Sequence, residues 1–297
     1  MTQTPPSVLA FLERAKNVKD EDKMHRFEGR LYPTVVSPAV NLEALRTMEA
    51  RADDVMLVAY PKCGFNWVVA VLRRIIAASS GVKDSSDITQ LIEFLTPEGQ
   101  KGMAGQPSPR IIGTHLYHEM IPASFKEKKA KALVVWRNPK DTVVSYFHFM
   151  NKNPVLPNVE WNQFFSDFMS GEVGWGSYFD HALAWNKHMD DPNVKIVTFE
   201  ELKQDLSEGI RQISQFFGFP LTEEQVQSIH SESTFSAMSA NSVLGQNMGS
   251  VLFRKGEVGD WKNHLSEAQS QQMDEEFNKT LAGTKLGALL KYDTYCK

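Results

Sequence analysis

The feature that most constrains the fold of this chain is an apolar stretch that passes through a short turn into a second apolar stretch. Residues 55–60 have the composition of a buried strand, and apolar side chains recur at helical spacing after the turn. Backbone N–H groups at the start of such a helix have no partner within it, and the helix dipole adds positive charge there. Because Lys62 lies in the turn, the pattern predicts a cradle for the phosphates of a nucleotide.

The nucleotide is not expected to be ATP or GTP. No Gly-Lys pair followed by Ser or Thr occurs in the chain, and that sequence marks the loop that holds triphosphates. The alternative interpretation of Lys62 is a solvated loop lysine, but the strand–turn–helix context favours the anion cradle.

Strands and helices are expected to alternate along the chain. The candidate strands are short and apolar, and they span residues 55–60, 110–114, 132–136 and 194–199. One candidate helical stripe consists of Leu202, Leu206, Ile210, Ile213 and Phe217. The alternation predicts an α/β fold, a single domain over residues 1–297 with a central parallel sheet flanked by helices. In such a fold, ligands bind at the carboxyl ends of the strands.

Local signals add detail to this fold. Asn138 followed by Pro139 is typical of the N-cap and first turn of a helix, and Gly218 is typical of a C-cap. Residues 81–109 and 236–250 show no strong pattern, so we expect mobile loops there that close over a ligand.

The composition is that of a globular protein with no general affinity for polyanions. The 297 residues are 42% hydrophobic and carry a net charge of −4, which leaves no basic surface for nucleic acid or a membrane. No apolar run approaches the ~20 residues of a membrane span, and the first thirty residues are too charged for a signal peptide. A cytoplasmic protein is therefore expected. Two cysteines, Cys63 and Cys296, make no disulfide framework, so both are predicted to be free.

Two motifs resemble those of a known family. Residues 60–67, Tyr-Pro-Lys-Cys-Gly-Phe-Asn-Trp, resemble the Tyr-Pro-Lys-Ser-Gly-Thr-Thr-Trp signature of the cytosolic sulfotransferases. Residues 253–263 resemble the family's second signature, Arg-Lys-Gly-x-x-Gly-Asp-Trp-Lys. The motifs occur in the family's order, and the similarity covers most of the chain. Cys63 and the run Gly256-Glu257-Val258-Gly259 look closest to the family-6 branch, subgroup B.

The resemblance implies the cofactor 3′-phosphoadenosine 5′-phosphosulfate (PAPS), whose product is adenosine 3′,5′-bisphosphate (PAP). The first loop would hold the 5′-phosphosulfate, a matching arginine and serine together with the second signature would hold the 3′-phosphate, and aromatic and hydroxyl side chains would meet the adenine. The residues carried over are Lys62, Cys63, Gly64, Phe65, Asn66, Trp67, Arg137, Ser145, Phe199, Ser233, Thr234, Phe235, Phe253, Arg254, Lys255 and Gly256.

Two of these residues have ordinary structural alternatives. Arg137 has the planar fork that suits a phosphate dianion, and its alternative is a salt bridge across strand ends. Ser145 could instead return its hydroxyl to its own helix. Asp141 is expected to orient the site rather than act as an acid.

The chain departs from the family pattern at several positions. Phe65 and Asn66 replace threonines, which changes side-chain contacts but leaves the backbone N–H cradle. Phe199 replaces a tyrosine, and Gly113 replaces a lysine that approaches the transferred sulfonate in relatives. Lys62 is therefore expected to carry more of the stabilisation of charge on the leaving phosphate.

His115 is the predicted general base. Removing a proton from an attacking hydroxyl or amine suits a histidine, and His115 follows a predicted strand at its carboxyl end. Thr114-His115-Leu116 also resembles the family's Lys-Thr-His-Leu motif, which contains the catalytic histidine. His118 lies three residues further on, but no third ligand cluster accompanies the pair, so no metal site is predicted.

The predicted function is sulfuryl transfer from PAPS to a hydroxyl or amine of a small hydrophobic acceptor, such as a phenol, sterol or iodothyronine. Pocket walls are expected around residues 146–150. The alternatives are a PAPS- or PAP-binding protein with weak or lost turnover and, less favoured, a nucleotide-dependent phosphoryl transferase.

Two further expectations concern Cys63 and the oligomeric state. Cys63 lies at a predicted helix N-terminus beside Lys62, which would favour a reactive thiolate that PAPS protects. The alternative interpretation of Cys63 is a small buried spacer. Many relatives dimerise through a Lys-x-x-x-Thr-Val-x-x-x-Glu segment, where this chain has Ser266, Glu267 and Gln271 in place of the Thr-Val pair and the glutamate. Paired Glu267 side chains at a two-fold axis would repel, so a monomer or an atypical homodimer is expected.

Overall fold

The computed structural model describes residues 6–81, 91–234, 236–238, 251 and 254–297. The strands are β1 (Met24–Phe27), β2 (Arg30–Pro33), β3 (Val55–Ala59), β4 (Ile111–Thr114), β5 (Lys131–Trp136) and β6 (Val194–Thr198). The helices up to the end of the sheet are α1 (Pro6–Lys16), α2 (Ala39–Ala44), α3 (Phe65–Ser80), α4 (Pro97–Gly102), α5 (Ala123–Glu127), α6 (Pro139–Lys152), α7 (Trp161–Ser170) and α8 (Tyr178–Asn186). Those after it are α9 (Phe199–Gln204), α10 (Leu206–Phe217), α11 (Glu223–Glu232), α14 (Glu267–Thr280), α15 (Lys285–Leu289) and α16 (Tyr292–Tyr295).

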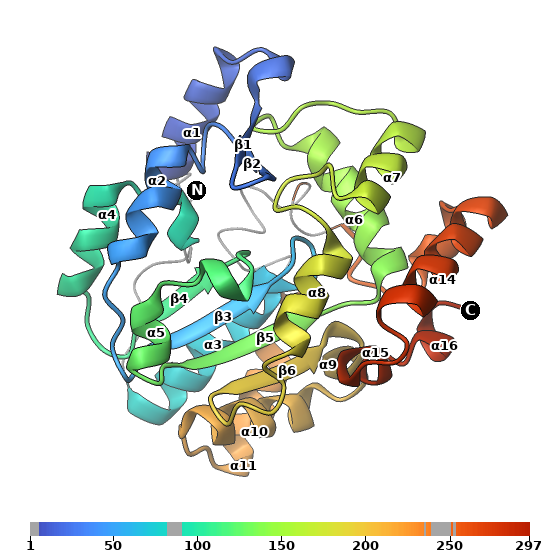
Figure 1. Ribbon diagram of the computed structural model, residues 1–297. Helices are drawn as coiled ribbons and strands as arrows, with labels where there is room; N and C mark the ends of the chain where they lie inside the picture. The colour runs from blue at the N-terminus through green and yellow to red at the C-terminus, as the bar shows by residue number, and fades with distance from the viewer. Residues whose placement is uncertain (1–5, 82–90, 235, 239–250, 252–253) are drawn as a thin grey trace.

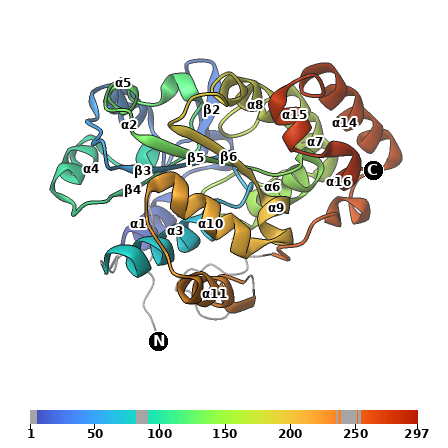
Figure 2. The same cartoon turned by 90° about the horizontal axis from the view of Figure 1, so that it is seen from below.

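A parallel sheet of four strands forms the centre of the molecule (Figure 1), in the order β4-β3-β5-β6. All five side chains of β3 are buried, as expected for an apolar central strand covered on both faces. Figure 2 shows α3, α10 and α11 on one side of the sheet and α5 and α8 on the other. A separate antiparallel hairpin joins β1 to β2. The predicted α/β fold and its four strands are confirmed, with small differences at the strand ends.

Several local predictions are also confirmed. The Asn138 side chain caps α6 by accepting a hydrogen bond from the Asp141 N–H at 2.8 Å, with Pro139 in the first turn. Gly218 ends α10 with a φ of +82°, a conformation that glycine adopts without strain. Within the described ranges, no helix is both long and apolar enough to cross a membrane.

Two predictions about helices and loops are wrong. The stripe over residues 202–217 belongs to two helices, because the Asp205 carboxylate accepts a hydrogen bond from the Glu208 N–H at 2.9 Å and starts α10 as a new helix. Residues 91–109, expected in a mobile loop, contain α4 and a short 3₁₀ helix, Ile92–Phe94, whose Glu93 is fully buried. Residues 82–90 and 239–250 lie outside the described part of the chain.

A buried ion pair links the start of the sheet to the loop before β4. The Arg110 guanidinium meets the Asp54 carboxylate in two contacts, at 2.7 Å from Nε and 2.6 Å from Nη2, and both side chains are almost fully buried. Such a bidentate pair is strong, and the loss of one partner leaves the other charge without compensation.

We expect Asp54→Ala to lower the free energy of unfolding by about 3–5 kcal/mol, because it leaves the buried Arg110 charge without its ion-pair partner. Urea denaturation followed by circular dichroism measures this change. Asp53 is the exposed neighbour, and Asp53→Ala serves as the matched control with an expected effect within about 0.5 kcal/mol. A loss no larger in Asp54→Ala than in the control would contradict the prediction.

Candidate active site

The turn between β3 and α3 has the geometry that an anion cradle requires. Gly64 has a φ of +107°, and a Cβ atom there would lie 3.0 Å from Cδ2 of Phe199. Lys62 also has a positive φ, +71°. The turn is closed by a hydrogen bond from the Cys63 N–H to the Tyr60 carbonyl at 3.1 Å. Since α3 begins at Phe65, the N–H groups of its first residues are free of intrahelical partners and available to a ligand.

Three cations act on one another beside this turn. Burial, helped by the charges of Arg137 and Arg254, lowers the pKa of Lys62 to about 7. The ammonium group lies 4.3 Å from the centroid of the Phe149 ring, and the Arg137 guanidinium lies 4.5 Å from that of Phe199. Because these surroundings disfavour the charged form of Lys62, a bound anion would raise the pKa of Lys62 and restore the charge of its ammonium group.

Arg137 is bound to the second signature loop. Its Nη2 donates to the Glu257 carbonyl at 2.7 Å, and its buried Nε has no hydrogen-bond partner among the described residues. A salt bridge, the alternative role considered for Arg137, is weak by comparison, with 3.9 Å between Nη2 and the Asp141 carboxylate. Asp141 instead accepts from the N–H groups of Gly259 at 2.7 Å and Trp261 at 3.0 Å, so it orients the loop, as expected.

Asp260 holds the other two cations of the second signature. Its carboxylate lies 2.5 Å from both Arg254 Nη1 and Lys255 Nζ, and 3.3 Å from His264 Nε2. Burial alone would raise the pKa of Asp260. The hydrogen bonds from Lys255, Asn263 and Arg254 nevertheless hold this pKa well below its usual value. Asp260 therefore keeps this cationic loop in place without an external anion.

Aromatic rings and hydroxyls gather on the far side of the turn. The Trp67 ring lies 5.2 Å from Phe199, and its indole N–H donates to the Ser233 carbonyl at 2.7 Å. Ser233 is fully buried, and its hydroxyl has no partner among the described residues. The partly exposed Thr234 lies next to it. An unpartnered buried hydroxyl beside two rings fits an adenine, which offers nitrogen acceptors around a flat apolar face.

The remaining predicted cofactor residues occupy varied places. Asn66 and Ser145 are partly exposed, in the first turn of α3 and on α6 respectively, and Gly256 has a φ of +66°. Phe235 and Phe253 lie outside the described residues.

The prediction of a reactive thiolate at Cys63 is wrong. The side chain is fully buried, its Sγ lies 3.7 Å from the Thr142 hydroxyl, and burial raises the pKa of the thiol to about 12. The sulfur points into the core while the backbone of the residue forms the turn, so Cys63 contributes its backbone rather than its thiol to the site. Cys296 is also buried and free.

His115 is held in one tautomer. Its Nδ1 lies 2.5 Å from the Ala59 carbonyl oxygen, which can only accept, so Nδ1 carries the proton and Nε2 keeps its lone pair. Burial, helped by the charge of Lys62, lowers the pKa of His115 to about 4, so the ring is neutral at physiological pH. The rings of Phe65 and Trp175 each lie 5.2 Å from it, both edge-on. The predicted base, the predicted phosphate lysine and a set of apolar rings thus meet at one place.

Sequence reasoning missed Glu93 and Trp175 at this place. The buried Glu93 carboxylate accepts from the His115 N–H at 2.9 Å and from the Trp175 indole N–H at 3.1 Å. A glutamate in a segment without clear periodicity gives no signal of burial. The positive φ of Trp175, +62°, could have been anticipated from its two flanking glycines, which mark a strained turn.

Residues 146–150, the expected pocket walls, lie in different surroundings. Phe149 faces Lys62, but Tyr146 is fully buried and donates to the Gly174 carbonyl at 2.9 Å, and Met150 lies in the core. A helix packed on a sheet must turn one of its faces to the core, and these two residues lie on that face.

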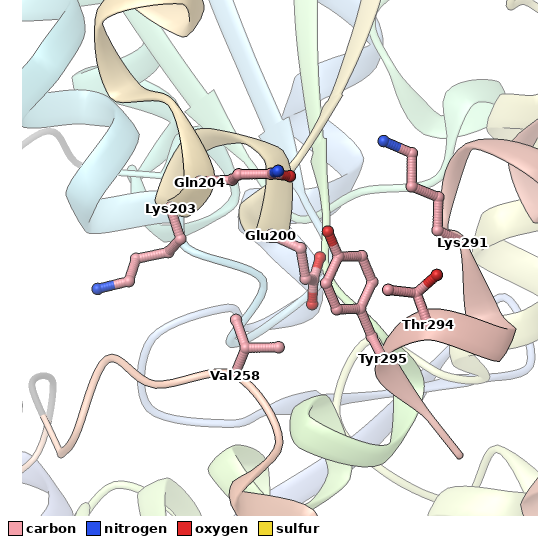
Figure 3. A pocket seen from close by; sticks show the side chains of 7 residues that line it. All are labelled: Glu200, Lys203, Gln204, Val258, Lys291, Thr294 and Tyr295. Carbon is pink, nitrogen blue, oxygen red and sulfur yellow. The ribbon is translucent and has the colours of Figure 1, made fainter.

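A hollow lies beside the second signature loop, which contributes Val258 to its wall (Figure 3). It has a volume of about 550 Å³ and is lined by Glu200, Lys203, Gln204, Val258, Lys291, Thr294 and Tyr295. None of these seven is a predicted site residue. One oxygen of Glu200 accepts hydrogen bonds from the backbone N–H and the side-chain amide of Asn138, at 2.9 and 2.7 Å.

Comparisons with known proteins identify the family. The model of the sulfotransferase domain matches residues 52–285. Sulfotransferase 6B1 of Danio rerio is 62% identical over 289 residues, covering 96% of this chain and 98% of that protein. Sulfotransferase 6B1 of Homo sapiens is 48% identical over 288 residues, covering 96% and 95%. The crystal structure of mouse sulfotransferase SULT7A1 complexed with PAP matches with a TM-score of 0.83 at 33% identity, over 92% of this chain and 99% of that one.

The chain therefore belongs to the sulfotransferase family. The similarity to the two 6B1 sulfotransferases supports the family-6 branch, subgroup B. The sulfuryl donor of this family is PAPS, and the protein is a PAPS-dependent sulfotransferase. Its own residues fit that cofactor, because buried Arg137 Nε and Ser233 Oγ both lack partners among the described residues.

The low pKa of Lys62 predicts that binding of PAP takes up a proton. Above pH 7 the cofactor-free protein holds Lys62 largely neutral, and a nearby phosphate raises its pKa. Affinity should therefore fall as the pH rises from about 7 to 9, by at most tenfold per unit. Calorimetry at about pH 8.5 in two buffers with different ionisation enthalpies measures the uptake.

Lys62→Arg is the matched control, because a guanidinium stays charged throughout this range. It should bind PAP without proton uptake at about pH 8.5. Equal uptake by the parent and this variant would assign the proton to another group.

Proposed function

We propose that the protein transfers the sulfuryl group of PAPS to a hydroxyl or amine of a small hydrophobic acceptor, with His115 as the general base. The observation that carries this proposal is the contact between His115 Nδ1 and the Ala59 carbonyl at 2.5 Å. It leaves the Nε2 lone pair to accept the acceptor's proton. We include in the proposal a single domain over residues 1–297, a cytoplasmic location and a monomer or an atypical homodimer.

The neighbouring side chains support roles on either side of the reaction. PAPS supplies the sulfuryl group and a phosphate leaving group. Lys62 would stabilise the charge that develops on that phosphate, and Arg137 and Arg254 would bind the 3′-phosphate. Phe65, Phe149 and Trp175 place apolar rings beside His115 and Lys62, which favours an acceptor with an aromatic or alicyclic body.

Turnover is tested by incubating the protein with labelled PAPS and a panel of phenols, sterols, iodothyronines and amines. A parallel incubation with ATP and Mg²⁺ tests phosphoryl transfer. Labelled product from PAPS alone supports the proposal. PAP binding without product from any acceptor would favour a binding protein that has lost turnover.

We expect His115→Ala to lower kcat by ~10²-fold or more, because the general base acts only in the transition state. The affinity for PAP, measured by calorimetry, should change by less than about twofold. His118→Ala is the matched control. His118 stacks on His188 at 3.4 Å between ring centroids, and turnover of this variant should stay near that of the parent. A His115→Ala enzyme within about threefold of the parent would eliminate His115 as the base.

Arg137→Ala and Arg254→Ala should lower the affinity for PAP. They should barely change the affinity for adenosine 5′-phosphate, which lacks the 3′-phosphate. A charged hydrogen bond contributes about 1.5–3 kcal/mol, so the ratio of the two dissociation constants should shift by about tenfold or more at each site. Competition against a labelled nucleotide gives both constants. Equal weakening of both nucleotides would place these arginines away from the 3′-phosphate.

A further inference from the structure

The strongest unexplained feature of the site is the buried carboxylate of Glu93. The side chain is fully buried, and its three described donors are all uncharged. Oε1 accepts from the His115 N–H at 2.9 Å and from the Trp175 indole N–H at 3.1 Å, and Oε2 accepts from the Thr114 hydroxyl at 2.9 Å. Burying a carboxylate without a cation partner is costly. A group retained at such a cost calls for a role that an apolar residue would not fill.

The donors of Glu93 belong to the two segments that surround the predicted base. Thr114 and His115 lie where β4 ends, and Trp175 lies in the loop before α8. The Trp175 loop is itself fixed, because the Tyr146 hydroxyl donates to the Gly174 carbonyl at 2.9 Å and the Tyr60 hydroxyl donates to the Gly176 carbonyl at 2.9 Å. Glu93 thus connects the end of the strand to a rigid loop.

The backbone of His115 is held on both sides. Glu93 accepts from its N–H, and Nε2 of the buried His181 lies 3.1 Å from its carbonyl oxygen. With Nδ1 bound to the Ala59 carbonyl, Nε2 is the polar atom of His115 that no described hydrogen bond uses. A base whose backbone and ring are fixed loses little entropy when it meets the acceptor.

We propose that Glu93 is a positioning residue, which locks His115 and Trp175 relative to one another so that His115 Nε2 faces the acceptor against the Trp175 ring. The proposal rests on the proposed role of His115 as the base. Burial raises the pKa of Glu93 to about 7, which the hydrogen bonds from its partners oppose. The carboxylate form suits the role, because it alone offers both oxygens purely as acceptors to three donors.

Glu93→Gln tests the proposal with nearly the same shape. The glutamine amide places an NH₂ group, which cannot accept a hydrogen bond, where one carboxylate oxygen stood. At least one hydrogen bond from the three donors is therefore lost. We expect kcat to fall by about tenfold or more. The affinity for PAP should stay within about twofold, because the bonds of Glu93 go to the acceptor side of the site. Glu98→Gln, an exposed glutamate in the first turn of α4, is the matched control.

Thr114 provides a second pair of variants that keeps the carboxylate. Thr114→Val removes the donor to Oε2 and keeps the shape, and Thr114→Ser restores the hydroxyl. We expect a drop of kcat in the valine variant and recovery to within about twofold of the parent in the serine variant. Equal losses in both variants would show that packing, not the hydrogen bond, matters here, and would count against the proposal.

Nitrogen NMR of the histidine rings separates this proposal from the role of His115 as the base. In the parent, His115 should show one neutral tautomer with the proton on Nδ1, and in Glu93→Gln the signals should shift toward a mixture of tautomers. An unchanged His115 spectrum together with kcat within twofold of the parent would overturn the positioning role. If His115→Ala retains turnover, the base assignment is wrong, whereas the ring spectrum still reports whether Glu93 fixes His115.

A double-mutant cycle tests whether Glu93 acts through His115 or independently of it. If Glu93 acts through His115, Glu93→Gln should add less than a twofold loss in the His115→Ala background, since the group it positions is already absent. A further loss as large as that in the parent would mean that Glu93 acts independently of His115, and the proposal would be wrong.

Discussion

The parallel pairing of β3 with β4 is the constraint on which the site depends. Val58 lies opposite Thr114, so both strands end at the same edge of the sheet. The chain leaves β3 into the turn that contains Lys62 and leaves β4 into His115. The hydrogen bond from His115 to the Ala59 carbonyl ties these two ends together. The proposed phosphate-binding turn and the proposed base are thereby brought together by backbone pairing.

On the proposed cofactor side of the site, carboxylates offset the repulsion between neighbouring cations. Asp260 provides a counter-charge to Arg254 and Lys255, and Asp141 accepts from backbone N–H groups of the same loop. Lys62 has the Phe149 ring beside it, and burial lowers its pKa to about 7. The loop is therefore formed and charged without a ligand, whereas Lys62 has a lowered pKa that a bound anion would raise. Such preorganisation reduces the structural change required when the ligand binds.

Three departures from the family pattern fall where the fold depends on the backbone rather than on the side chain. Cys63 gives the turn its N–H while its sulfur lies in the core. Phe65 replaces a hydroxyl with a ring that packs against His115, which makes this edge of the site more apolar. Gly113 pairs with Leu57 in the sheet, so its replacement of a lysine leaves the strand intact and removes only a charge. The fold accommodates all three changes because strand pairing and turn geometry do not use those side chains.

The sequence alone was enough for the elements whose signals are local. The apolar run of β3, the Asn138–Pro139 start of α6 and the Lys62 turn could be predicted, because strand composition, helix capping and turn chemistry depend on neighbours in the chain. The break at Asp205 was missed, since a hydrophobic stripe alone does not show where a side chain will cap a new helix. Tertiary structure decided the rest. Three properties depend on what packs against a residue from distant parts of the chain. They are whether Cys63 is a thiolate or a buried thiol, whether the face of α6 that carries Tyr146 is buried, and whether Glu93 is solvated or holds His115. Burial and hydrogen-bond partners are properties of the folded molecule, and they set charge and orientation at the site.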